Sequence, residues 1–165
     1  IIKDNPKLTC RINGLEHTSP TRIILDKDLR VPIYSNVVTT AKKNKTIIFF
    51  DSKNLNKINK MRNLGVIMIR IPCNKSNSFN LVDVLKKIKS LGYSRIFLES
   101  GLKLTNSFLI NFLIDDFYLF ISDNRLGLNG RNSFRKSMKF FKKNKRITNN
   151  KVNLLGDSLL SFRLK

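Results

Sequence analysis

The residues best suited to chemistry lie near the start of the chain, in the segment Asp4-Asn5-Pro6-Lys7-Leu8-Thr9-Cys10-Arg11. A guanidinium can donate two parallel hydrogen bonds to a phosphate, so Arg11 is a candidate phosphate ligand. The carboxylate of Asp4 can orient a hydroxyl group or move a proton, and Leu8 offers an apolar contact. The alternative is a surface ion pair between Asp4 and Arg11, which contributes little. Taken alone, the segment favours the ion pair.

A second polar segment, Glu99-Ser100-Gly101, directly follows an apolar run. Ligands of parallel α/β sheets bind at the carboxyl ends of strands, and the amides at the start of a helix favour an anion. Thr105 and Ser107 add hydroxyl groups. The alternative, equally favoured by this segment alone, is that Thr105 caps a helix and Glu99 is an ordinary surface carboxylate. Together the two segments suggest two walls of one site for a phosphorylated substrate.

Short apolar runs and amphipathic segments predict the elements that position these residues. One helix is expected between Asn80, as its cap, and Gly92, which stops it. A second is expected after Gly101, with Leu104, Phe108, Leu109 and Phe112 on its inner face. Strands are expected at residues 21–25, 46–50, 66–71, 94–98 and 117–121.

The order of these elements predicts the fold class. Strands that alternate with helices favour an α/β domain with a mostly parallel sheet flanked by helices. Residues 151–155 and 158–164 predict an antiparallel hairpin around Gly156-Asp157. We therefore expect a mixed sheet with an antiparallel C-terminal hairpin, in one domain over residues 1–165.

The charge balance allows two interpretations. Lys and Arg outnumber Asp and Glu by 32 to 11, a net charge of +21. Such an excess is typical of nucleic-acid binding, but a genome rich in A and T also inflates Lys, Asn and Ile. Because the lysines are scattered, the second interpretation is favoured. The basic segment 135–146 carries Phe140 and Phe141; it suggests either a single-stranded nucleic-acid platform or, as we favour, a solvated connection with both rings turned inward.

The cysteines and the histidine of the sequence bear on the cellular compartment and on metal binding. Cys10 and Cys73 are far apart with no Cys-x-x-Cys spacing, which favours a reduced, cytoplasmic protein. His17, the single histidine, lies in a polar loop and is expected to be exposed, so no metal site is predicted. No apolar run is long enough to suggest a membrane span.

Several motifs occur in an order that is typical of one family. They are residues 4–11, 20–26, 98–101, Leu104 with 107–109, 115–117, 126–127 and 156–160. With these motifs the chain resembles the reductase (C-terminal) domain of the bacterial bifunctional riboflavin-biosynthesis deaminase-reductase. The resemblance covers nearly the whole chain, and the first and third of the motifs are fairly specific.

The resemblance implies a dihydrofolate-reductase-like fold and a reaction. NADPH would supply a hydride that reduces the ribose of 5-amino-6-(5-phosphoribosylamino)uracil to a ribityl group. Asp4 would lie beside the nicotinamide and the reacting sugar; Leu8, Arg11 and Glu99 would contact substrate, Arg11 at its phosphate. The cofactor would also meet Lys27, by our inference at a phosphate, and the run Gly101, Leu102, Lys103, Leu104, Thr105, Asn106 and Ser107. The family further implies a homo-oligomer.

The chain also departs from the family pattern. Ser100 stands where the family usually has glycine, and a positive φ there would be strained. The family's opening strand and its zinc-binding deaminase domain have no counterpart in these residues, so we expect an N-terminally truncated reductase domain that is poorly stable and inactive alone, with the deaminase upstream in the parent chain. The rival functions are a divergent reductase-like domain with another ligand and a basic nucleic-acid-binding domain.

Overall fold

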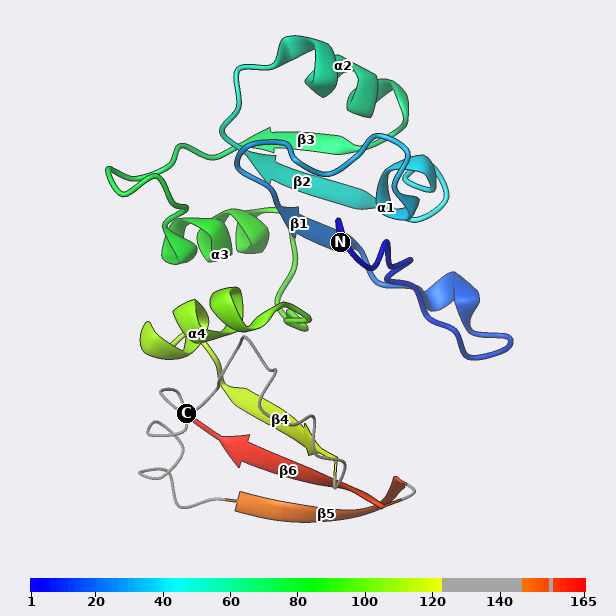
Figure 1. Ribbon diagram of the computed structural model, residues 1–165, viewed down its shortest axis with the longest axis vertical. Coiled ribbons are helices and arrows are strands. Elements are labelled where there is room, and N and C mark those ends of the chain that lie inside the picture. The colour runs from blue at the N-terminus through cyan, green and yellow to red at the C-terminus, as the bar shows by residue number, and fades with distance from the viewer. Residues whose placement is uncertain (123–146, 155) are drawn as a thin grey trace. The chain divides into compact units, whose positions relative to one another are not determined.

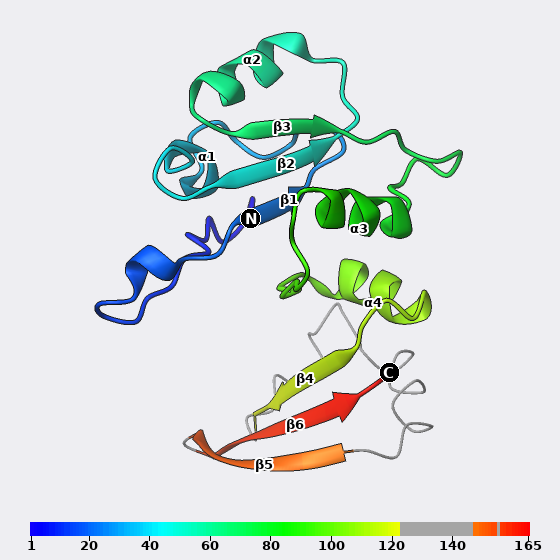
Figure 2. The same ribbon diagram turned by 180° about the vertical axis from the view of Figure 1, so that it is seen from behind.

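The computed structural model describes the backbone of residues 1–122, 147–154 and 156–165, and the side chains of 1–122 and 156–165. The chain divides into two compact units, residues 1–90 and 91–165. Each unit carries its own three-stranded sheet (Figures 1 and 2).

The first unit is built on a parallel sheet. Its strands β1 (Arg22–Leu25), β2 (Thr46–Phe50) and β3 (Ile67–Arg70) lie in the order β1-β2-β3. Ile23 pairs with Ile47, and Ile47 with Ile67. All five residues of the central strand β2 are buried, as expected for a continuous apolar run covered on both faces.

The helices of this unit carry much of its core. They are α1 (Asn36–Thr39), α2 (Leu55–Asn63) and α3 (Leu81–Ser90), with a 3₁₀ turn at Glu16–Thr18. Helices α1 and α2 contribute to one apolar cluster with alternate residues of the strands. That cluster contains Ile24, Ile48 and Phe50 of the strands, Val37 and Val38 of α1, and Ile58 and Met61 of α2.

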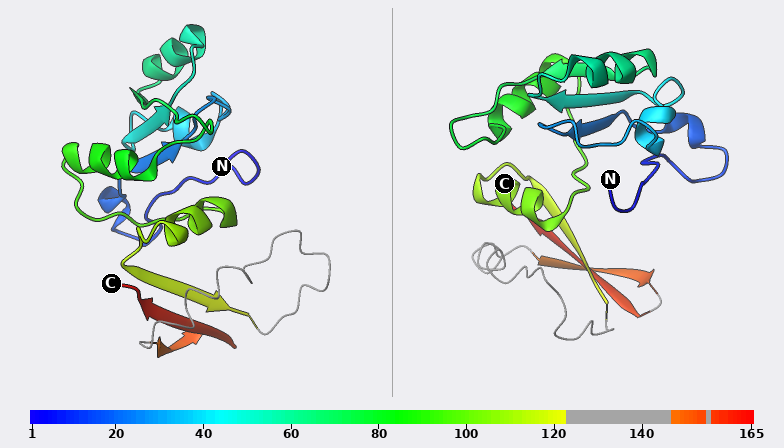
Figure 3. Two further views of the ribbon diagram at one scale, coloured as in Figure 1. Left: turned by 90° about the vertical axis from the view of Figure 1, so that its left-hand side faces the viewer. Right: turned by 45° about the horizontal axis from the view of Figure 1, so that its top comes forward.

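The second unit is antiparallel. It contains α4 (Leu102–Ile110), β4 (Asp116–Ile121), β5 (Ile147–Leu154) and β6 (Asp157–Arg163), and the strand order is β4-β6-β5 (Figure 3). Phe162 of β6 and Leu109 of α4 form the centre of its core. The rings of Phe117 and Phe162 lie 6.2 Å apart between centroids, tilted by 54°.

Most of the predicted elements are confirmed. The strands expected at 21–25, 46–50, 66–71 and 117–121 are β1 to β4, and the C-terminal hairpin is β5 and β6, with Gly156 at φ +101°. The side chain of Asn80 accepts a hydrogen bond from the N–H of Val82, 3.0 Å, and Gly92 follows α3 with φ +90°. The basic segment 135–146 and the motif 126–127 lie outside the described residues.

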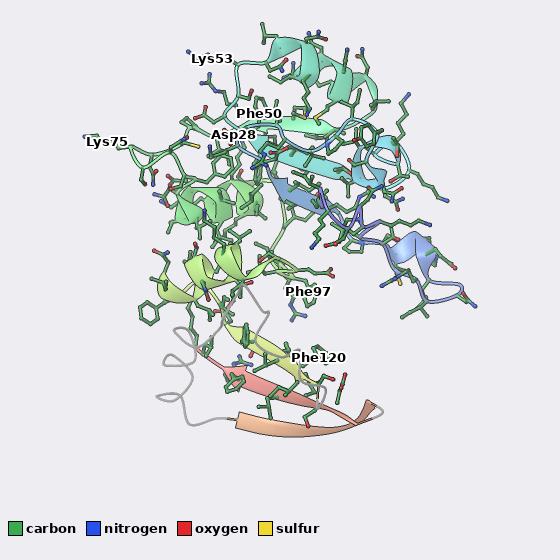
Figure 4. The ribbon with its side chains drawn as sticks, in the orientation of Figure 1. Asp28, Phe50, Lys53, Lys75, Phe97 and Phe120 are labelled. Atoms are coloured by element: carbon green, nitrogen blue, oxygen red, sulfur yellow. The ribbon has the colours of Figure 1, made fainter. Side chains whose placement is uncertain are left out.

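Two expectations about the sheet are wrong. The described strands form two sheets instead of one mixed sheet, and residues 94–98 form no strand. A strand needs a hydrogen-bonded neighbour, and among the described residues none pairs with this run. Ile96 is 47% and Phe97 85% exposed, and Phe97 is labelled just ahead of α4 in Figure 4. Helices α1 and α2 were not expected.

No helix among the described residues has the length and apolar character that crossing a bilayer requires. His17 is exposed in the 3₁₀ turn, as expected. Cys10 and Cys73 are both free and half-buried. Burial is the main reason that the pKa of Cys73 is raised, and the nearby Asp51 carboxylate adds to it. The thiol of Cys73 is therefore poorly suited to act as a nucleophile.

Asp51 closes the carboxyl end of β2. Its Oδ2 accepts a hydrogen bond from the N–H of Cys73, 2.8 Å, and its Oδ1 from Nε of Arg70, 3.0 Å. These two interactions, the Cys73 amide foremost, lower the pKa of Asp51. The charged carboxylate thus links the end of β2 to the last residue of β3 and to the segment that leaves it.

This contact predicts how stability depends on pH. Because the folded-state pKa of Asp51 lies below the unfolded value, its contribution is complete above about pH 4 and is lost as the pH falls through the folded value. We expect Asp51→Asn to be less stable at pH 7 and to lose stability less steeply on acidification. Urea unfolding of the full gene product, followed by circular dichroism at pH 7 and at low pH, measures this. The control is Glu16→Gln, an exposed carboxylate with no side-chain partner in the described residues; equal acid sensitivity of wild type and Asp51→Asn would contradict the prediction.

Candidate functional site

The loop of residues 4–11 belongs to the first unit and is held at three points. The N–H of Asn36 donates to Oδ1 of Asn5, 2.8 Å, and Nδ2 of Asn36 donates to the carbonyl oxygen of Asn5, 2.7 Å. Nη1 of Arg22 donates to the carbonyl oxygen of Lys7, 2.9 Å. The N–H of Cys10 donates to Oγ of Ser19, 3.1 Å. The loop is therefore fixed at residues 5, 7 and 10.

The backbone of the loop is unusual at two of its residues. Asn5 has φ +40° and Leu8 has φ +52°. Asparagine tolerates the left-handed region, but a leucine there costs about 1 to 2 kcal/mol. Leu8 is partly buried and packs against the core cluster of the first unit, which offsets that cost. Leu8 thus serves as an apolar anchor of the loop, besides its expected contact with substrate.

The side chains of Asp4 and Arg11, at the two ends of the loop, are exposed and unpaired among the described residues. Neither Asp4 nor Arg11 makes a side-chain hydrogen bond or an ion pair with any described residue. The surface ion pair between them, which was the alternative interpretation, is not formed. Both groups remain available to an external ligand.

Lys27 lies two residues after the end of β1, and its ammonium group already has partners within the protein. Its Nζ lies 2.7 Å from Oδ1 and 2.8 Å from Oδ2 of Asp28, and 3.3 Å from Oδ1 of Asn77. Figure 4 labels Asp28 beside the carboxyl ends of the parallel strands. A cofactor phosphate at Lys27 would therefore share this ammonium with Asp28.

An open hollow of about 500 Å³ lies at the carboxyl end of β1. Its lining includes the cations Lys3, Lys27 and Arg30, and one acid, Asp26. The Asp26 carboxylate is occupied locally, because it accepts the N–H groups of Arg30, 2.8 Å, and Val31, 2.7 Å. The hollow is therefore positively charged and suits an anionic ligand, at the end of the sheet where ligands commonly bind.

The second predicted segment, residues 99–107, begins α4 in the second unit. Glu99 is exposed and makes no side-chain hydrogen bond to the described residues. Gly101 is the N-cap with φ −67° and ψ 162°. Ser100 is not among the residues with positive φ, so the strain expected from a serine there does not arise.

The first turn of α4 is open to a ligand. The N–H groups of Leu102 and Lys103 have no acceptor among the described residues. A Cβ added at Gly101 would meet no atom within 4 Å, so the backbone can be approached closely there. Free amides at a helix start, with room beside them, fit a phosphate-bearing group such as the pyrophosphate of NADPH.

The hydroxyl groups of this helix are largely used within it. Oγ1 of Thr105 lies 3.0 Å from Oγ of Ser100 and 3.3 Å from the carbonyl oxygen of Gly101. Thr105 therefore does not cap α4, contrary to the alternative interpretation. Ser107 donates its hydroxyl to the carbonyl oxygen of Lys103, 3.1 Å. Asn106 is half-buried in the same helix.

Sequence reasoning missed Arg22 and Asn36, which hold the loop. Arg22 is 3% exposed although it lies in an apolar strand, and a charged residue inside such a run was the available signal, since buried charges need partners. Asn36 begins a helix of four residues, too short to give a periodic pattern. The joining of segments 4–11 and 99–107 into one site stays a prediction, because they belong to separate units.

The comparisons with known proteins agree on one family. The family model "RibD C-terminal domain" matches residues 1–160. The riboflavin biosynthesis protein RibD of Aquifex aeolicus is 33% identical over 168 residues, covering 98% of this chain and 43% of that protein. Its counterpart from Actinobacillus pleuropneumoniae is 31% identical over 128 residues, covering 77% of this chain and 33% of that protein. The chain thus spans less than half the length of these relatives.

Solved structures show the same fold at lower identity. RibD of Acinetobacter baumannii, form 2, superposes with a TM-score of 0.66 at 20% identity, over 97% of this chain and 43% of that one. A pyrimidine reductase-like protein from Corynebacterium diphtheriae gives a TM-score of 0.63 at 15% identity, over 88% of this chain and 61% of that one. With an α/β fold like that of the RibD reductase domain and a family match over nearly all its residues, the chain belongs to the RibD C-terminal domain family.

Proposed function

We propose that this chain is the reductase part of riboflavin biosynthesis and reduces the ribose of 5-amino-6-(5-phosphoribosylamino)uracil to the ribitylamino product, with NADPH as reductant. The observation that carries the proposal is the anchored loop 4–11, which leaves the carboxylate of Asp4 and the guanidinium of Arg11 unpaired. Family membership supplies the reaction class.

In this reaction the protein forms no covalent bond with the substrate. When bound, NADPH would supply a hydride to the anomeric carbon of the sugar. A proton would be added to the ring oxygen, and the bond between the anomeric carbon and the ring oxygen would break. Asp4, beside the sugar, is suited to orient that oxygen and to hold the proton. The other residues bind and orient the two reactants and exclude water from between them.

Phosphate recognition is the proposed task of Arg11. An unpaired guanidinium on an anchored loop loses little conformational freedom when it binds, which favours tight recognition. Leu8 and Glu99 are proposed to contact the substrate as well. Leu8 is held by its packing on the core, whereas Glu99 is exposed and has no side-chain partner in the described residues.

The cofactor is proposed to bind along residues 101–107, with its pyrophosphate at the free amides of Leu102 and Lys103. Lys27, in the positively charged hollow at the end of β1, is proposed to meet another of its phosphates, in competition with Asp28. Zinc is proposed only for a deaminase domain upstream.

Further predictions concern the setting of the reaction. We propose that residues 1–165 act as one reductase domain, within a cytoplasmic homo-oligomer whose parent chain also carries the deaminase. The two rival functions make different predictions: a nucleic-acid-binding domain would bind with a steep salt dependence, and a divergent domain would bind NADPH while ignoring the pyrimidine.

The substrate assignment predicts the effect of Arg11→Ala. In the full gene product, NADPH oxidation at 340 nm should occur only with the phosphorylated substrate. Arg11→Ala should raise the KM for that substrate roughly 10- to 100-fold, the cost of losing a charge-assisted phosphate contact. The dissociation constant for NADPH should not change, because Arg11 is proposed to contact only the substrate.

The matched control is Arg62→Ala, which removes an exposed guanidinium from α2 that has no side-chain partner in the described residues. It should leave KM unchanged. An equal KM increase in both variants would mean that Arg11 acts only through net charge. No substrate-dependent oxidation by the folded wild type would contradict the proposed reaction.

The cofactor assignment predicts the effect of Gly101→Ala. Since Gly101 has φ −67° and an added Cβ meets nothing within 4 Å, alanine fits the fold and should destabilise it by less than about 1 kcal/mol. The methyl group would fill the space through which an anion reaches the amides, so the dissociation constant for NADPH should rise roughly tenfold. Calorimetric titration with NADPH measures this, with the urea midpoint as control; unchanged affinity would place the cofactor elsewhere.

A further inference from the structure

The pairing of Asn5 with Asn36 joins two segments 31 residues apart in the sequence. Both hydrogen bonds run from Asn36: its N–H to Oδ1 of Asn5, and its Nδ2 to the Asn5 carbonyl oxygen. The N-cap of α1, Ser35, provides no side-chain cap. Asn5 therefore supplies the acceptor that caps α1, and in return the side chain of Asn36 fixes the carbonyl of Asn5, the residue that follows Asp4.

The two partners differ in how the rest of the fold holds them. The residues after Asn36, Val37 and Val38, are fully buried in the core of the first unit, and Ser35 before it is 2% exposed. Asn5 is exposed and adopts φ +40°. The helix start is thus the rigid partner, and the loop depends on it for its conformation.

We infer that Asn36 is a positioning residue for the ligand-binding loop. Its side-chain amide holds the carbonyl oxygen of Asn5, a residue whose backbone is left-handed with φ +40°. This contact sets the direction of Asp4 and, together with the further anchors at Lys7 and Cys10, that of Arg11. The inference rests on the proposed function for its catalytic consequence, but the contact itself does not. Asn36 touches neither substrate nor cofactor in this account.

The substitution Asn36→Asp separates positioning from stability. Aspartate is nearly isosteric with asparagine, but it has a carboxylate oxygen where asparagine has the Nδ2 donor. In the wild type, Nδ2 lies 2.7 Å from the Asn5 carbonyl oxygen. Two oxygens would face each other there in the variant, so the contact becomes repulsive. A carboxylate in the first turn of a helix is favourable for the helix itself. The loop should therefore move while α1 stays folded.

The test compares Asn36→Asp with Asn56→Asp in the full gene product. Asn56 lies in the first turn of α2, is exposed, and makes no side-chain hydrogen bond within the described residues, so the substitution also adds one negative charge to the first turn of a helix. For Asn36→Asp we expect the KM for the phosphorylated substrate to rise roughly tenfold, as for the loss of one good hydrogen bond, with the thermal midpoint unchanged. Asn56→Asp should change neither.

A second measurement distinguishes failure of this inference from failure of the proposed function. Backbone amide chemical shifts of residues 4–11 should change in Asn36→Asp, while those of β1 and β2 stay as in the wild type. If the wild type oxidises no NADPH with the substrate, the proposed function fails, and the shifts alone decide the inference. Unchanged loop shifts, or a KM that rises equally in the Asn56→Asp control, would overturn the positioning role of Asn36.

Discussion

The buried guanidinium of Arg22 is the interaction on which the first unit depends. Its Nε and Nη2 donate to Oγ1 of Thr46, 3.0 and 2.6 Å, and Nη2 also donates to the carbonyl oxygens of Asn44, 2.7 Å, and Val37, 3.3 Å. Nη1 bonds Oγ1 of Thr40 and the Lys7 carbonyl oxygen, each at 2.9 Å. All these acceptors are neutral, and burial lowers the pKa of Arg22. A buried charge is tolerated only when it is fully hydrogen-bonded, so these segments have to stay in place around it.

This constraint explains why an exposed loop can serve as a binding element. The residues that hydrogen bonds hold in place, at 5, 7 and 10, lie among those proposed to meet ligands, at 4, 8 and 11. The backbone is held by the sheet and by α1, and the charged side chains of Asp4 and Arg11 remain unpaired. A loop that is already ordered binds with a smaller entropic cost than one that must order on binding. The start of α4 in the second unit is ordered in the same sense. Its free amides belong to a regular helix, so they too need no ordering when a ligand binds.

The sequence predicted the elements that have a strong local pattern. The apolar runs of β1 to β3, the capped helix between Asn80 and Gly92, and the hairpin at Gly156-Asp157 follow from side-chain periodicity and turn chemistry. The run 94–98 has the same local pattern as those strands but no partner among the described residues, and pairing is a long-range property that composition does not contain. The residues that anchor the loop, Arg22 and Asn36, were not predicted for the same reason. Their roles depend on hydrogen-bond partners that lie 15 and 31 residues away in the sequence. The strain expected at Ser100 did not arise because the turn into α4 uses ordinary negative φ.

Loop 4–11 can hold Asp4 and Arg11 in place only if it is ordered before any ligand binds. The most direct measurement is amide hydrogen exchange by NMR on the ligand-free full gene product. We expect slow exchange, well below the rate of an unstructured chain, at the amides of Asn5, Cys10 and Asn36. These amides donate to the Ile1 carbonyl oxygen, to Oγ of Ser19 and to Oδ1 of Asn5, respectively. The amides of Lys7 and Arg11, which have no acceptor among the described residues, should exchange faster. Exchange of all five at unstructured rates would show that the loop is not preformed, and would contradict the account.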